Sequence, residues 1–244
     1  MSGAPLSVDQ SLRRVSAADP DDIVFLLPGN HFRANDQHVL AVETAQRQDA
    51  LNAASEGADW VVQLGTDEII PNMGVVIQHL GAAAARRARA LEFRARMFYA
   101  RTNDRRFLER CARWWTTQAG FPGPILVAAG TTLTHAREAA QAPLYRVDIS
   151  PWSNDPAHSR AARVHAVIPC EQAILQLSWV RTEEQMQEKS VVSGYASSRD
   201  RGSELRRWRR AANPLRRAAM APFAPSPFAR FRLTRLPQFA GLEP

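Results

Sequence analysis

The chain has 244 residues, of which 45% are hydrophobic and 23% charged, as expected of one globular domain with a tail. No stretch approaches the ~20 apolar residues of a membrane span, and residues 1–19 lack the apolar run of a secretory signal. The net charge of +7 is uneven, because residues 201–244 hold ten arginines and two glutamates while the rest holds 21 basic and 22 acidic residues. This distribution disfavours a nucleic-acid-binding domain, which usually carries its basic residues across a folded face.

The first half of the chain predicts alternating strands and helices. After a flexible N-terminus at residues 1–20, the apolar run Asp22–Leu27 stops at Pro28 and predicts a buried strand. Residues 38–56 contain no glycine or proline and predict a helix. The apolar run Trp60–Leu64 predicts a second strand, which leads directly into an acidic turn.

The second half continues the pattern with fewer clear signals. Residues 72–90 predict a helix, and residues 91–99 and 125–128 predict strands. A further helix is expected after Val180, because Thr182 and Gln185 have the spacing of a capping box. We therefore expect an α/β fold with a mostly parallel sheet and flanking helices over residues 21–203, followed by a basic tail at 204–244.

The chain contains two cysteines, Cys111 and Cys170, without the spacing of a metal site. We expect both to be free thiols in a reducing compartment. With the absence of an apolar span, this favours a cytoplasmic location.

The acidic turn Gly65–Glu68 is the segment that best suggests chemistry. Ligands of open α/β sheets bind beyond the carboxyl ends of the strands, and Asp67 and Glu68 lie at such an end. Two carboxylates there could hold Mg²⁺ or Mn²⁺, which would bridge a diphosphate and neutralise its charge. The alternative is a strand end followed by a solvated acidic turn.

Several segments resemble bacterial family 2 glycosyltransferases, which have the GT-A fold. Gln46–Glu68 is similar to the family's arginine-bearing helix followed by a strand that ends in Asp-x-Asp-Glu. Ile174–Lys189 is similar to an aliphatic strand followed by Ser-Trp-Val-Arg and an acidic helix with a lysine. Pro122–Ile125, Leu133–Arg137 and Leu144–Asp148 resemble the acceptor side of the same group.

This resemblance covers roughly residues 40–200 and implies a GT-A-like (Rossmann-like) fold. It also implies transfer of a sugar from a nucleoside-diphosphate donor to an unidentified acceptor, assisted by Mg²⁺ or Mn²⁺. The metal set that it implies is Asp67, Glu68 and Gln176, with Glu68 more often a positioning group in the family. The donor-binding set that it implies is Arg47, Trp179, Arg181 and Lys189, and Arg181 can grip phosphate through two hydrogen bonds.

The sequence departs from the family at three positions. Gly65 stands where the first Asp is expected, and Gln176 and Tyr195 stand where histidines are expected. The strand and loop that hold the nucleotide base in the family are also missing, so we expect a fold incomplete at the N-terminus. Either translation starts further upstream or the donor site is incomplete. The alternative function is a catalytically degenerate GT-A-like protein that binds a glycan or a partner.

The candidates for a general base that deprotonates an acceptor hydroxyl are Asp148 and Asp155. The alternative, which the residue type favours for each, is a turn or capping residue. For His135 the hypothesis is a contact with the acceptor, and the alternative is an ordinary loop histidine. For Trp114 and Trp115 the hypothesis is stacking on a sugar ring, and the alternative is core packing.

The tail interleaves arginines with Trp208, Phe223, Phe228, Phe231 and Phe239. This composition suits peripheral contact with an anionic membrane at the inner face. The alternative is a segment that folds over the domain, with the arginine stems covering apolar surface.

Overall fold

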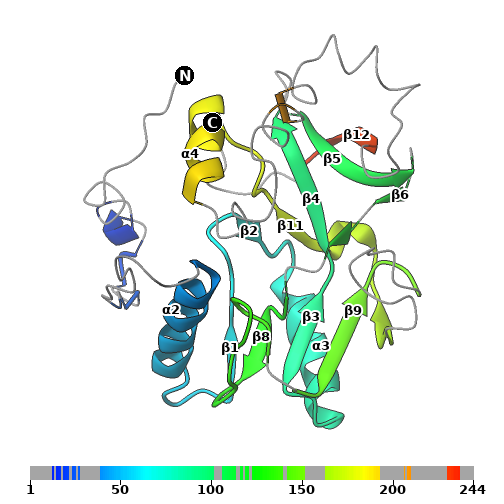
Figure 1. Cartoon of the computed structure of the whole chain (residues 1–244). Coiled ribbons are helices and arrows are strands. Elements are labelled where there is room, and N and C mark those ends of the chain that lie inside the picture. Colours follow the sequence, from blue (N-terminus) through cyan, green and yellow to red (C-terminus); the bar gives the residue numbers. More distant parts are fainter. Residues whose placement is uncertain are drawn as a thin grey trace.

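The computed structural model describes residues 39–101, 106–113, 116–117, 119–120, 123–139, 142–151, 163–192, 206, 208–209 and 230–236, with 13, 15–17, 19–21, 24–25 and 27 in addition. The described residues form an α/β fold (Figure 1). Its elements are α2 (Val39–Ala54), β1 (Trp60–Val62), β2 (Glu68–Ile69), α3 (Met73–Ala85), β3 (Ala90–Phe93), β4 (Ala95–Arg101), β5 (Arg106–Arg113), β6 (Thr116–Thr117), β7 (Ala119–Gly120), β8 (Leu126–Ala128), β9 (Leu144–Asp148), β10 (Ala166–Val167), the 3₁₀ turn Cys170–Gln172, β11 (Ile174–Gln176), α4 (Glu183–Val192) and β12 (Arg230–Arg235).

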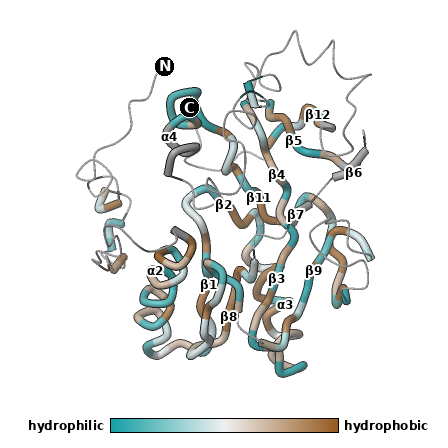
Figure 2. The backbone as a smooth tube through the Cα atoms, in the orientation of Figure 1, coloured by the Kyte–Doolittle hydropathy of each residue, from teal (hydrophilic) through white to brown (hydrophobic). Residues whose placement is uncertain are grey.

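The first sheet has the strand order β1-β8-β3-β9-β10 and packs against α2 and α3. β8 is antiparallel to β1 and β3, whereas β9 is parallel to β3 and β10. Successive side chains of a strand point to opposite faces. Accordingly Ala90 packs with Leu51 of α2, and its neighbour Leu91 packs with Val76 and Ala83 of α3. Figure 2 shows hydrophobic residues along these central strands.

The second sheet has the order β12-β5-β4-β11-β2, with β6 on β5 and β7 on β4. β4 is parallel to β11 but antiparallel to β5, and β11 is antiparallel to β2. Both sheets are therefore mixed, and the prediction of a mostly parallel sheet is wrong for the molecule as a whole. One cause lies in the connections: β4 ends at Arg101 and its antiparallel neighbour β5 begins at Arg106, which leaves no room for the long crossover that parallel neighbours need.

Arg94 is the point where the chain passes from the first sheet to the second. The strand predicted at 91–99 is in fact two strands, β3 and β4, on either side of this residue. The Arg94 N–H donates to the carbonyl of Val147, and its own carbonyl accepts from the N–H of Ile174. Its side chain is fully buried at 0% exposure, so this junction lies in the core.

The helix predictions are largely confirmed. α2 matches the expected segment, and α3 begins after Asn72, whose side chain accepts from the N–H of Val75. α3 ends earlier than expected, because Arg87 adopts a positive φ of 55°. The capping box of α4 is present, with Thr182 N–H donating to Gln185 Oε1 at 3.1 Å and Gln185 N–H to Thr182 Oγ1 at 3.3 Å.

The buried strand predicted at Asp22–Leu27 is wrong at the residues that the structure describes. Val24, Phe25 and Leu27 lie outside any strand and are 47%, 80% and 46% exposed. The N–H of Val24 donates to Asp19 Oδ2 at 2.7 Å. An apolar run forms a buried strand only where a neighbouring strand offers hydrogen bonds. Here the Val24 N–H binds the nearby Asp19 carboxylate instead.

The C-terminal segment contacts the domain where the structure describes it. β12 pairs antiparallel with β5 along its whole length, from Arg230 opposite Cys111 to Arg235 opposite Arg106. Trp208 is buried at 6% exposure. These contacts agree with a segment that folds over the domain. No described helix is long and apolar enough to cross a membrane.

Candidate functional site

The acidic turn between β1 and β2 is compact because residue 65 is a glycine. The Gly65 N–H donates to Glu68 Oε2 at 2.8 Å, and the Glu68 N–H donates back to the Gly65 carbonyl at 3.1 Å. A Cβ at position 65 would lie 2.9 Å from Asp67 Oδ1 and 3.4 Å from Glu68 Oε2. The space next to Gly65 is therefore occupied by the two carboxylates that follow it.

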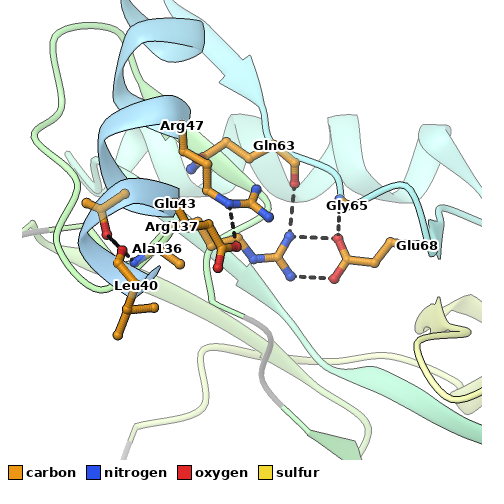
Figure 3. A network of polar contacts seen from close by, with 9 residues as sticks. Leu40, Glu43, Arg47, Gln63, Gly65, Glu68, Ala136 and Arg137 are labelled. Atoms are coloured by element: carbon orange, nitrogen blue, oxygen red, sulfur yellow. Dashed lines mark hydrogen bonds and ion pairs between the residues drawn. The ribbon is translucent and has the colours of Figure 1, made fainter. Parts of the chain in front are cut away.

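Glu68 is held by Arg137 through both carboxylate oxygens (Figure 3). The two nitrogen to oxygen distances are 2.7 Å and 2.5 Å, and the side chains of Arg137 and Glu68 are only 5% and 2% exposed. Arg137 also donates to the Gln63 carbonyl at 3.3 Å. A metal ion at Glu68 would therefore be repelled by the positive charge of Arg137, which disfavours the predicted role of Glu68 as a metal ligand. Its position suits a residue that fixes the turn.

The loop that carries Arg137 is itself anchored to α2. The Ala136 N–H donates to Thr44 Oγ1 at 2.8 Å, and the Leu133 N–H donates to Gln48 Oε1 at 2.7 Å. Gly123 lets the arginine pass, since a Cβ there would lie 3.0 Å from Arg137 Cγ. Sequence reasoning placed Leu133–Arg137 on the acceptor side and missed its role beside the acidic turn.

Asp67 has a more open environment than Glu68. Its Oδ2 accepts the Ser178 hydroxyl at 2.6 Å and lies 3.6 Å from Arg181 Nη2. The side chains of Asp67 and Arg181 are 25% and 32% exposed. Gln176 Nε2 donates to the same Ser178 hydroxyl at 3.2 Å. The predicted residues Asp67, Gln176 and Arg181 therefore come together around Ser178, to which the sequence analysis gave no role.

The pairing of β2 with β11 explains this convergence. Glu68 lies opposite Gln176 in the antiparallel register, and the Leu177 N–H donates to the Asp67 carbonyl at 2.8 Å. Asp67 precedes Glu68 by one residue and Ser178 follows Gln176 by two. Because the strands are antiparallel, both residues lie at the same end of the strand pair, where their side chains meet.

The other predicted donor residues have different surroundings. Arg47 on α2 is paired with Glu43 at 3.1 Å and lies on the same side of the turn as Arg137 (Figure 3). The Trp179 ring stacks on Tyr99, with centroids 5.3 Å apart. Lys189 is in α4, but its side chain lies outside the described residues, as do Asp155, Trp114, Trp115 and Tyr195.

Asp148 is a buried residue rather than a solvent-facing one. Its Oδ2 accepts from Arg94 Nε at 2.8 Å, its Oδ1 accepts from the Ile149 N–H at 2.7 Å, and its exposure is 0%. A general base must reach a substrate proton. Asp148 is placed instead as a link between strands.

A divalent cation would find one suitable carboxylate here. The described residues contain no group of three His, Cys, Asp or Glu side chains that could hold a metal. Mg²⁺, however, commonly uses one or two carboxylates together with water and phosphate oxygens. The oxygen donors of Asp67 and its neighbours therefore fit such an ion only when a phosphate ligand completes the set.

A separate groove of about 700 Å³ lies between α2 and the 132–135 loop. Leu40, Ala41 and Thr44 line it from the helix, and Leu133 and His135 line it from the loop. Its lining is mostly apolar and does not include Asp67 or Ser178. His135 therefore lines this groove.

The two cysteines lie apart from the candidate site. Both are free thiols, as predicted. Burial raises the pKa of the Cys111 thiol to about 11, so this side chain is protonated at neutral pH. It behaves as a small core residue.

No family model matches this chain, and neither the curated proteins nor the solved structures include a significant match.

Proposed function

We propose that this protein is a GT-A-type glycosyltransferase that moves a sugar from a nucleoside-diphosphate donor to an acceptor hydroxyl. The proposal rests on one observation: Asp67, in the turn between β1 and β2, keeps solvent access in a cluster with Gln176, Ser178 and Arg181. A carboxylate and an arginine side by side suit a metal-bound diphosphate, since one binds the cation and the other the phosphate oxygens.

In the proposed reaction the acceptor oxygen bonds to the anomeric carbon while the bond from that carbon to the diphosphate breaks. The electron pair leaves with the nucleoside diphosphate, and the acceptor proton goes to a base. Mg²⁺ or Mn²⁺, held by Asp67, would supply charge neutralisation for the leaving group. Arg181 would bind the diphosphate directly, and Arg47 of α2 stays a predicted donor-binding residue. Asp155 remains the predicted base, because Asp148 is buried.

Ser178 has a positioning role in this proposal. Its hydroxyl donates to Asp67 and accepts from Gln176, so it fixes the carboxylate oxygen that Arg181 approaches. Glu68 and Arg137 hold the turn through their ion pair, and the proposal gives them no contact with the donor.

Calorimetric titration of UDP and GDP, with and without Mn²⁺, tests the proposal. We expect one of the nucleotides to bind more tightly with Mn²⁺, and we expect Asp67→Asn to abolish that difference. Asp59→Asn is the matched control, because it removes the same charge from an exposed position just before β1. If neither nucleotide binds the folded wild type in any metal condition, the enzyme proposal fails.

The second candidate is a degenerate GT-A-like protein that binds a glycan or a partner. It is favoured by the turn, where carboxylates fill the space that a side chain at position 65 would need and Arg137 takes Glu68. It predicts glycan or partner binding that does not depend on Mn²⁺ or Asp67.

Peripheral membrane contact through residues 204–244 stays a further proposal. Arg232 of β12 is already paired with Glu109 at 2.8 Å, so it is not available to lipid phosphates. Binding to anionic vesicles that falls steeply with salt would support a membrane role for the remaining tail arginines.

A further inference from the structure

Trp208 joins the C-terminal segment to the loop beside Asp67. Its indole N–H lies 3.0 Å from the carbonyl oxygens of both Tyr99 and Trp179, and the residue is 6% exposed. One donor therefore ties the end of β4 to residues 177–182. Such a shared donor is sensitive to the position of both carbonyls.

The rings around this hydrogen bond come from distant parts of the chain. Trp179 stacks on Tyr99 at 5.3 Å with an interplanar angle of 20°. Phe231 of β12 also packs against Tyr99, with the two ring centroids 4.9 Å apart. Two pieces of the C-terminal segment thus converge on one aromatic cluster, defined here as Tyr99, Trp179, Trp208 and Phe231.

The Trp179 carbonyl leads from this cluster to the candidate site. It accepts the Arg181 N–H at 3.1 Å as well as the Trp208 indole, as a carbonyl with two lone pairs can. The preceding residue is Ser178, whose carbonyl accepts from Arg181 Nε at 3.0 Å and whose hydroxyl binds Asp67. A shift of this carbonyl would therefore move both groups that contact Asp67.

We propose that Trp208 is a positioning residue: its indole N–H fixes the 178–181 loop and so sets the geometry of the Asp67 site. The C-terminal segment then belongs to the functional site rather than to an independent tail. Arg209 adds a second tie, because it pairs with Glu183 at the start of α4, directly after this loop. The functional part of this inference rests on the proposed glycosyltransferase, whereas its structural part does not.

Trp208→Phe tests the inference, since it keeps an aromatic ring and removes the donor. We expect amide hydrogen exchange to accelerate at residues 177–181 and to stay unchanged in β9. We also expect affinity for UDP or GDP with Mn²⁺ to fall about fivefold, which is the size of one modest hydrogen bond. Trp60→Phe is the control, because it makes the same substitution at a tryptophan of β1 that packs against the hydrophobic core cluster containing Val76 and Ala83 of α3.

The outcomes separate this inference from the proposed function. Unchanged exchange at 177–181 would overturn the inference whatever the nucleotides do. Faster exchange with unchanged nucleotide affinity would also overturn it, because the loop would then not govern the site. If wild type binds no nucleotide, the proposed function fails, while the exchange data still decide whether Trp208 fixes the loop.

A second variant covers the case in which Trp208→Phe does not fold. Phe231→Leu loosens the aromatic cluster from β12 without removing a hydrogen bond to the loop. The inference expects faster exchange at 177–181 in this variant too, by a smaller factor, and equal exchange in wild type and variant would contradict it.

Discussion

Arginines hold carboxylates in two regions of this molecule, and they do so differently. Between the strands, Arg94 pairs with Asp148 and Arg96 with Glu109, each at 2.8 Å and with side chains no more than 6% exposed. At the acidic turn, Arg137 and Glu68 form another buried pair, but Arg181 lies 3.6 Å from Asp67 and these two side chains are 32% and 25% exposed. Pairs of the first kind are short and buried, whereas the Arg181–Asp67 pair is longer and partly exposed to solvent.

This difference separates structural charges from functional ones. A buried pair that loses one partner leaves an uncompensated charge and costs about 3–5 kcal/mol, whereas an exposed pair contributes about 0–1 kcal/mol. Substitutions in the strands should therefore act on stability, and substitutions at Asp67 should act on binding.

Glu109→Gln should cause the largest loss of stability. Glu109 is 0% exposed and accepts from Arg96 at 2.8 Å and 2.9 Å and from Arg232 at 2.8 Å. The neutral amide would leave two partly buried guanidinium groups without a countercharge, so we expect a loss of about 3–5 kcal/mol in the free energy of unfolding. Urea unfolding measures it, with the exposed Glu56→Gln as control. A loss below about 1 kcal/mol would contradict the structural assignment.

The same carboxylate predicts acid sensitivity. Desolvation by burial acts to raise the pKa of Glu109, but hydrogen bonds from Arg96 and Arg232 outweigh it and hold the pKa below 4.5. Because the folded pKa is lower than the unfolded one, this stabilisation is present above about pH 4.5 and is lost as the pH falls through the folded value. Glu109→Gln should flatten this part of the stability curve, and an unchanged slope would rule out Glu109 as its source.

Arg137→Met should have the next largest effect. It leaves Glu68 buried without its partner, and we expect a loss of about 2–3 kcal/mol because the turn can open to water. Gly123→Ala should act in the same direction and more weakly, since Gly123 has a φ of 98° and an added Cβ would press on Arg137 Cγ. Thermal unfolding of both variants provides the comparison. Stability equal to wild type in Arg137→Met would show that the ion pair does not hold the turn.

His165→Gln should give the smallest change, and its distinctive effect is on the pH dependence of stability below neutral pH. Desolvation by burial lowers the pKa of His165, and the charges of Arg163, Arg86 and Arg146 add to this effect. Its Nδ1 accepts the Arg146 N–H at 3.0 Å, so the neutral ring is required. The folded pKa is lower than the unfolded one, and stability should fall as the pH drops below about 6.5. The variant should lack this step in a pH series of melting temperatures.

The sequence predicts local features well and long-range ones poorly. The α2 segment, the Thr182–Gln185 capping box and the strand before Asp67 follow from periodicity and capping, which are local. The break at Arg94, the reversed strand β8 and the pairing of β12 with β5 depend on partners far along the chain. The sequence names Asp67, Gln176 and Arg181, but the hydroxyl of Ser178 becomes visible only when β2 and β11 are paired.

The most direct test of the division between the two regions is the binding of Mn²⁺ itself, followed by electron paramagnetic resonance of the free ion. We expect wild type to bind Mn²⁺ only in the presence of UDP or GDP. Asp67→Asn should lose this binding while its unfolding free energy stays within about 1 kcal/mol of wild type, because Asp67 is part of an exposed pair. Equal Mn²⁺ binding by wild type and Asp67→Asn, or a stability loss as large as that of Glu109→Gln, would contradict the account.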